Sequence, residues 1–302
     1  MRLPDFIMIG AAKAGTTTLY EYLCRHPQLF MCDPKEPEFF ARPHVYERGL
    51  DWYASLFEGA RPDQIVGEAS TIYTNYPFWP DPAPRIAQTV PRAKLIYVLR
   101  EPVSRAYSAY AQEMKNKQFA GEFTAIPATF EKRLSEVAYY VDSSDYKLQM
   151  EQYLRHYPRQ SLKVLLFEDL IADPGSVSRD VLDFLGADVS VDLTEQGEVL
   201  ANVAAAQMAD YSRGQLATRL KTVPGVTALK NVLPRSVRQK GIDLLHKSPL
   251  GKKVHEAVTP PPMQPDTRRR LIEHFAPKVD ELERFLGIDL GVWRKAWSKP
   301  RG

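Results

Sequence analysis

The sequence is poor in the residues that hold metals and disulfides, since its 302 residues include only two cysteines, Cys24 and Cys32, and six histidines. Two cysteines exclude a disulfide scaffold, and the scarcity of both residue types argues against a zinc site. We therefore expect two ordinary thiols in a reducing compartment, and hence a cytoplasmic protein.

Long apolar runs and an excess of charge are also lacking. No run approaches the roughly 18–20 residues that span a bilayer, and the first residues do not form a signal peptide. The 40 Lys plus Arg nearly balance the 37 Asp plus Glu, leaving a net charge of +3, so we expect no nucleic acid partner. With 44% hydrophobic and 25% charged residues, the composition is that of a soluble globular protein.

What the sequence does contain is a recurring succession of short apolar run, turn and helical spacing. The apolar runs cover 6–9, 95–99 and 164–167, with a shorter one at 65–69. Strand, turn and helix in repetition predict an α/β fold with a parallel sheet. Pro82 and Pro84 indicate a loop before a helix over 85–89.

The last third of the chain has a different character. Between 213 and 253 the only acidic residue is Asp243, against ten basic ones. This stretch is either a solvated helical face or a surface for an anionic ligand. Further on, the spacing predicts a helix with Asp266 as its N-cap, ended by Gly287. We expect a single domain over 1–302, with a helical, basic insertion at about 213–262.

The sharpest motif directly follows the first strand and reads G-A-A-K-A-G-T-T-T over 10–18. Two glycines five residues apart, between a strand and a helix start, form a loop whose amides surround phosphate oxygens. Ordinary nucleoside triphosphatases place a lysine after the second glycine. Here Thr16 stands at that position and the lysine lies inside the loop as Lys13, which suits an anion with less charge than a triphosphate.

A second motif follows the strand at 95–99 and reads R-E-P-V-S-R-A-Y-S over 100–108. Arg100 at a strand end and Ser108, about two helical turns into the next element, can converge on one anion at the carboxyl edge of the sheet. An arginine at a strand end also pairs with structural carboxylates, so this motif alone leaves both interpretations open.

Together the two motifs resemble those of sulfotransferases that use 3′-phosphoadenosine 5′-phosphosulfate (PAPS), in particular the carbohydrate branch with bacterial homologues. In that branch the motifs read K-x-G-T-T and R-[DE]-P-x-x-R-x-x-S. Further likenesses follow in order at 36–40 (E-x-x-F-F), 51–53, 146, 153–154, 167–170, 184–186 and the terminal helix near Trp293. The resemblance implies a P-loop-type three-layer α/β fold with a central parallel sheet flanked by helices, plus a mostly helical C-terminal region.

The resemblance also implies a reaction and a donor site. The enzyme would move a sulfuryl group from PAPS to a hydroxyl of a carbohydrate or small-molecule acceptor, without a metal, leaving the bisphosphate PAP. Arg100 and Ser108 would hold the 3′-phosphate, and a late loop with Arg213 and Gly214 would cover it, although that loop also reads as a simple turn. The 5′-phosphosulfate would lie on Lys13, Ala14, Gly15, Thr16, Thr17 and Thr18.

For catalysis, the resemblance implies Glu36 as the general base and Lys13 as the group that stabilises the leaving phosphate. Glu38 is the competing carboxylate. The aromatic residues Phe39, Trp52 and Tyr73 either wall the acceptor pocket or belong to the core.

This sequence departs from the family at one position. Relatives acting on heparan-type chains carry a second lysine after the glutamate of a segment matching 67–70, whereas this chain has Ala69. A second ammonium group near the leaving group must therefore come from another residue or be absent. The departure also weakens the expectation that this chain acts on the same class of substrate as those relatives.

Two other functions fit parts of the pattern. A P-loop kinase or nucleoside triphosphatase would use the same turn with Mg²⁺, but the shifted Lys13 and the missing G-K-[ST] argue against it. A non-catalytic module that binds anionic ligands could use the basic stretch, but it would require neither Glu36 nor Lys13.

Overall fold

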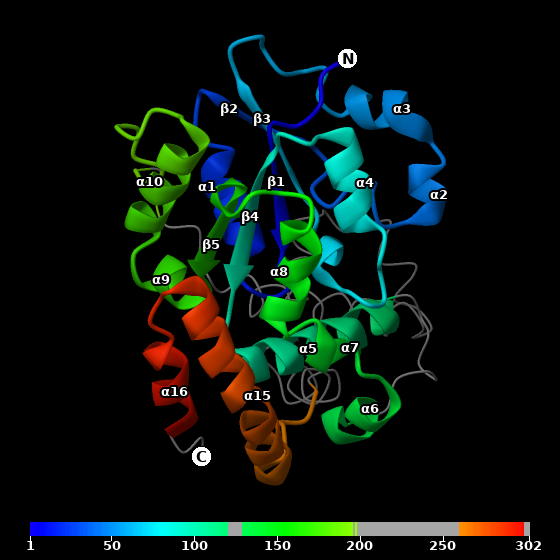
Figure 1. Ribbon diagram of the computed structural model, residues 1–302, viewed down its shortest axis with the longest axis vertical. Helices are drawn as coiled ribbons and strands as arrows, with labels where there is room; N and C mark the ends of the chain where they lie inside the picture. Colours follow the sequence, from blue (N-terminus) through cyan, green and yellow to red (C-terminus); the bar gives the residue numbers. More distant parts are fainter. Residues whose placement is uncertain (120–128, 196, 198–259, 299–302) are drawn as a thin grey trace, which may run out of the picture. The chain divides into compact units, whose positions relative to one another are not determined.

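The computed structural model describes residues 1–119, 129–195, 197 and 260–298 (Figure 1). The chain divides into two compact units, of which the first comprises Met1–Tyr110, Phe130–Val199 and Met263–Gly302. Most of the second unit, Ala111–Thr129 and Leu200–Pro262, lies outside the described residues. The predicted basic insertion falls there and stays a prediction.

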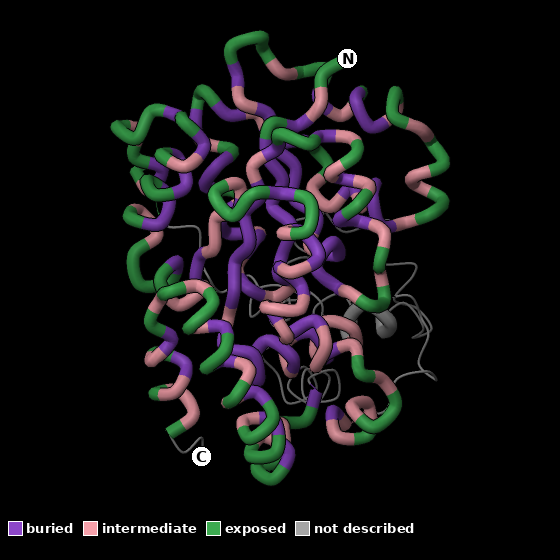
Figure 2. The backbone as a smooth tube through the Cα atoms, viewed as in Figure 1, coloured by how far each residue is buried: buried purple, intermediate pink, exposed green. Residues whose placement is uncertain are grey.

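Five parallel strands form the centre of the first unit. They are β1 (Phe6–Gly10), β2 (Leu29–Met31), β3 (Ile65–Ala69), β4 (Lys94–Leu99) and β5 (Leu162–Leu166). Their order in the sheet is β2-β3-β1-β4-β5. Every residue of β1 is buried, and Figure 2 shows burial concentrated along the strands. The parallel sheet predicted from the apolar runs is confirmed.

Helices cover both faces of the sheet, because right-handed crossovers leading in opposite directions from β1 leave their helices on opposite faces. Helix α1 (Thr16–Leu23) packs with α10 (Pro174–Leu185), and α4 (Pro82–Thr89) packs with α8 (Tyr146–Leu154). Figure 1 shows the strands running between these pairs. The other helices among the described residues are α2 (Pro43–Tyr46), α3 (Gly49–Ser55), α5 (Pro102–Phe119), α6 (Phe130–Glu136), α7 (Tyr139–Asp142), α9 (Phe167–Ala172), α15 (Pro265–Leu286) and α16 (Gly291–Ser298), with 3-10 turns η1 (Thr71–Thr74) and η2 (Arg159–Ser161).

Two predicted helix starts were wrong. Helix α4 begins at Pro82 rather than after the prolines, because the first helical turn needs no amide hydrogen from its residues and accepts proline there. Helix α15 begins at Pro265 with Gln264 as its N-cap, so Asp266 lies inside the first turn, although Gly287 ends the helix in a left-handed conformation as expected.

Candidate active site

The carboxyl ends of the strands bring the predicted motifs to one edge of the sheet. The 10–15 loop follows β1 and Arg100 follows β4, the neighbouring strand. The chain runs from β1 to β2 and β3 on one side and then returns to β4 on the other, so the strand order reverses between β1 and β4. Such a switch point is where open α/β sheets bind their ligands.

The loop after β1 turns through two left-handed residues, Lys13 with φ 72° and Gly15 with φ 83°. Gly15 is the N-cap of α1, and no described side chain caps that helix. The amides of the first helical turn therefore have no acceptor within the helix, which is the arrangement that binds anions. Ala14 is completely buried, and because its methyl group has no polar atom, only its backbone amide could contact an anion.

Phe167, the first residue of α9, packs against this loop. A Cβ atom at Gly15 would stand 2.8 Å from Cδ2 of Phe167. The loop can therefore approach the end of β5 this closely only because residue 15 has no side chain.

Arg100 joins the two motifs. Its Nη1 donates a hydrogen bond of 2.9 Å to the carbonyl oxygen of Lys13, and its guanidinium lies 4.6 Å from the ring centroid of Phe167. The structure thus brings the arginine of the second motif into direct contact with the first motif, a contact that the sequence did not predict. Phe167 belongs to the segment 167–170 that resembles the family, but the sequence did not predict that its ring supports Arg100.

The backbone of Arg100 is held from α8. The Tyr146 hydroxyl donates to the Arg100 carbonyl oxygen at 2.6 Å and accepts from the Arg100 amide at 3.3 Å. On the next residue, the Glu101 amide donates to Oε1 of Glu168 at 3.0 Å. These contacts fix the direction in which Arg100 leaves the strand.

Of the other residues predicted to bind the 3′-phosphate, the structure describes Ser108 alone. Ser108 is half-buried, on the same face of α5 as Ser104, which is one turn closer to Arg100. The role of Ser108 at the 3′-phosphate stays a prediction. Arg213 and Gly214 lie outside the described residues.

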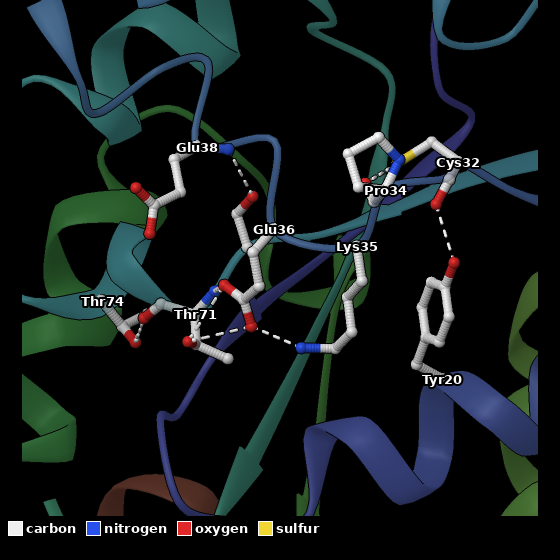
Figure 3. A network of polar contacts seen from close by, with 9 residues as sticks. Tyr20, Cys32, Pro34, Lys35, Glu36, Glu38, Thr71 and Thr74 are labelled. Carbon is white, nitrogen blue, oxygen red and sulfur yellow. Dashed lines mark hydrogen bonds and ion pairs between the residues drawn. The ribbon is translucent and has the colours of Figure 1, made fainter. Parts of the chain in front are cut away.

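Glu36 is held one strand away from the loop (Figure 3). Its amide donates to the carbonyl oxygen of Ala69, the last residue of β3, at 2.9 Å. Its carboxylate accepts from the Thr71 amide at 2.7 Å and from the Thr71 hydroxyl at 3.2 Å, and it pairs with the Lys35 ammonium. The side chain remains partly exposed, at 30% of its surface.

Glu38, the competing carboxylate, has different partners. Its amide donates to the Ser70 hydroxyl at 3.0 Å. Its carboxylate pairs with Nε of Arg42 at 2.7 Å. Figure 3 shows the Glu38 carboxylate pointing away from Lys35, so the two glutamates serve different neighbours.

The three aromatic residues predicted for the acceptor pocket are not equivalent. Phe39 and Tyr73 are only 2% exposed, and Phe39 stacks on Tyr53 with ring centroids 4.4 Å apart. Their rings belong to the core, which was the alternative interpretation. Trp52 is half-buried, with the Arg48 guanidinium 3.8 Å from its ring centroid, and its role at the acceptor stays a prediction.

Glu68 is a buried carboxylate close to this site to which the sequence analysis gave no role. It is fully buried in β3, where the Tyr53 hydroxyl donates to it. Burial raises its pKa to about 7, against hydrogen bonds from Tyr53, Ser70 and Tyr73 that lower it. The sequence feature that could have indicated this buried carboxylate is a charged residue within the apolar run 65–69.

Two further observations concern ligands. A cavity of about 610 Å³ lies at the opposite edge of the sheet, lined by residues that precede β1, β3 and β4, such as Asp5, Gln64 and Ala93. It is therefore separate from the switch point. Within the described ranges no group of three His, Cys, Asp or Glu residues could hold a metal ion.

Comparison with known proteins places these features in context. A family profile described as "Sulfotransferase domain" matches residues 3–233. The chain is 35% identical over 193 residues to human heparan sulfate glucosamine 3-O-sulfotransferase 3B1, covering 61% of this chain and 46% of that one. It is 42% identical over 111 residues to the membrane-associated sulfotransferase kil1 of Dictyostelium discoideum, covering 36% and 22%.

A solved structure matches over a longer stretch. A sulfotransferase from Alicyclobacillus acidocaldarius is 28% identical with a TM-score of 0.64, covering 97% of this chain and all of that one. In contrast, the chain spans about half the length of the curated heparan sulfate relatives it matches. In the described part of the chain, no helix has both the length and the apolar character of a membrane span.

Proposed function

The chain belongs to the sulfotransferase domain family, and from this we propose that it transfers a sulfuryl group from PAPS to a hydroxyl of a carbohydrate or small-molecule acceptor. The observation that carries the proposal is the hydrogen bond from Arg100 to the Lys13 carbonyl. It joins two anion-binding motifs at the switch point. A donor with phosphates at both its 5′ and 3′ positions needs two such sites, whereas AMP needs one.

The family match favours this reaction over the kinase and binding-module alternatives. PAPS supplies the sulfuryl group, and the protein positions the partners and neutralises charge. Glu36 accepts the proton of the acceptor hydroxyl as that oxygen bonds to sulfur. Lys13 neutralises the charge that builds on the 5′-phosphate oxygen as its bond to sulfur breaks.

Lys35 and Thr71 hold the Glu36 carboxylate in orientation for this step. The Glu36 amide donates a hydrogen bond to the carbonyl oxygen of Ala69, the position where this chain lacks the second lysine. Because Lys35 precedes Glu36 and pairs with its carboxylate, Lys35 brings an ammonium group close to that position. In the proposal, Lys35 compensates for that absence on the acceptor side.

The names of the curated relatives support a glycan hydroxyl as the acceptor. We also propose a cytoplasmic location, which accords with the free thiols of Cys24 and Cys32.

The donor is tested by calorimetry of the wild-type chain with PAP and with AMP. Each charge-assisted hydrogen bond to the 3′-phosphate contributes about 1.5–3 kcal/mol, so two of them predict a preference for PAP of about a hundredfold or more. Arg100→Ala should lose most of that preference. Equal affinity for the two nucleotides in the wild-type chain would contradict PAPS as the donor.

The base is tested by comparing Glu36→Gln with its matched control, Glu38→Gln. Turnover of PAPS with a panel of alcohol, phenol and carbohydrate acceptors is followed by mass spectrometry of the sulfated product. Glu36→Gln should lower turnover roughly 10²–10⁴-fold, the range for a positioned base, while PAP affinity stays unchanged. If Glu38→Gln alone has this effect, Glu38 is the base instead.

A further inference from the structure

The C-terminal helix α16 reaches the segment that carries Arg100. Its two tryptophans, Trp293 and Trp297, are four residues apart and therefore lie on one face of the helix. Trp293 is completely buried, and Trp297 is half-buried. Both lie beyond residue 233, where the family profile ends.

Trp297 contacts the residue directly after Arg100. Its Nε1 donates a hydrogen bond of 2.7 Å to Oε1 of Glu101. The same carboxylate accepts from the amides of Val103 and Ser104, each at 2.8 Å. Glu101 thus caps the first turn of α5 in the manner of an N-cap side chain, and Trp297 donates to Oε1, the same carboxylate oxygen that accepts from the Val103 amide.

Trp293 reaches the same segment through Tyr146. The two rings pack with centroids 5.9 Å apart, and the Tyr146 hydroxyl bonds to both the amide and the carbonyl of Arg100. One helix therefore contacts the backbone of the Arg100–Glu101 segment by two routes.

The helix itself is firmly attached to α15. Arg294 pairs with Asp280 and Glu283, each at 2.6 Å. Arg268 of α15 donates to the carbonyl oxygens of Ala296 at 2.8 Å and Trp297 at 3.3 Å. The Trp297 indole is therefore presented from a fixed support.

From these contacts we propose that α16 is part of the 3′-phosphate clamp, with Trp297 as a positioning residue that acts through Glu101 on Arg100. The inference rests on the proposed function, because it assigns Arg100 to the 3′-phosphate. Charge-assisted hydrogen bonds weaken steeply when their geometry is lost, so a small displacement of the Arg100 backbone reduces affinity for that phosphate selectively.

The test compares Trp297→Phe with Trp79→Phe, which makes the same change in a half-buried tryptophan away from Arg100. Affinities for PAP and AMP are measured by calorimetry, and melting temperatures are recorded as a check on folding. Trp297→Phe should reduce the preference for PAP over AMP about tenfold and leave AMP affinity unchanged. Trp79→Phe should keep the wild-type preference. Trp297→His retains a ring N–H donor, so its preference for PAP over AMP should lie between that of Trp297→Phe and that of the wild type.

Two results would overturn the inference alone: Trp297→Phe with the full wild-type preference, or an equal loss of affinity for both nucleotides, which indicates a merely structural role. A wild-type chain without any preference for PAP would instead overturn the proposed donor, and the inference with it.

Discussion

At the scale of single residues, Gly15 meets two requirements at once. Its backbone is left-handed, with φ 83°, and its missing side chain leaves room for Phe167 at 2.8 Å from where a Cβ would stand. Gly186, at the end of α10, has nearly the same φ of 84° but nothing within 4 Å of its Cβ position. The two glycines therefore separate the effect of backbone conformation from that of crowding.

Gly186→Ala should lower the free energy of unfolding by about 1–2 kcal/mol, the cost of a left-handed alanine. Gly15→Ala should cost about 1–3 kcal/mol more, because its methyl group overpacks against Phe167. It should also weaken PAP binding, because the loop must move. Urea unfolding of both variants measures the difference, and equal losses would show that Phe167 yields without cost.

Glu68 makes stability depend on pH. Its pKa is raised by burial from 4.5 to about 7, so the folded chain holds this proton more tightly than the unfolded chain. Its stabilising contribution is complete below about pH 4.5 and is lost as pH rises through about 7.

Glu68→Gln removes this titration and should flatten the decline in unfolding free energy between pH 4.5 and 7 by up to about 3 kcal/mol. Urea unfolding at pH 5, 6, 7 and 8 measures the slope. Glu21→Gln, which changes an exposed glutamate on α1, should keep the wild-type slope. A Glu68→Gln slope equal to that of the wild type would show that the carboxyl does not titrate in this range.

At the scale of elements, Asp145 connects α8 with α15. Its side chain accepts from the Leu148 amide at 3.3 Å, which caps α8, and it also pairs with the Lys278 ammonium. Because α8 carries Tyr146 against Arg100, this cap supports the site as well as the helix.

Asp145→Asn keeps an oxygen for the cap and removes the ion pair, whereas Asp145→Ala removes both. Asp145→Ala should therefore lower the free energy of unfolding by about 1 kcal/mol more than Asp145→Asn. The effect of Asp145→Asn should shrink at high salt, because partly exposed ion pairs are screened. Identical losses at all salt concentrations would show that the cap contributes nothing.

The strands that the sequence predicted are those with an apolar run long enough to be recognised. Strand β3 has the bounds of its apolar run, 65–69, while β5 begins two residues before the run at 164. Strand β2 was not predicted, because its three residues, Leu29–Met31, are too few to show a period. It exists through its pairing with β3.

The same distinction applies to the site. The loop and Arg100 were predictable because each follows a strand end in the sequence, and parallel strands end at one edge. Their supports were not, because Tyr146 lies 46 residues from Arg100 and Trp297 lies 196 residues from Glu101. Contacts over such separations are decided by tertiary packing and leave no local pattern.

At the scale of the whole molecule, charge distinguishes this proposed reaction from phosphoryl transfer. A transferred sulfuryl group carries one negative charge fewer than a terminal phosphoryl group, and Lys13 with the amides of the loop provides positive potential where charge builds.

Activity should therefore survive excess EDTA, with a rate within about twofold of the untreated enzyme. Sulfated product is measured with and without EDTA, and then after addition of Mg²⁺. Abolition by EDTA with rescue by Mg²⁺ would contradict the proposal and favour the kinase-like alternative.

The contact between Trp297 and Glu101 also sets a time of assembly during protein synthesis. The 10–18 loop is synthesised before β4 and Arg100. The indole that fixes the Glu101 cap emerges only 196 residues after that glutamate. Nascent chains, and fragments cut before α16, should therefore bind PAP with reduced preference, so that full donor selectivity is acquired only once Trp297 has left the ribosome and packed on Glu101.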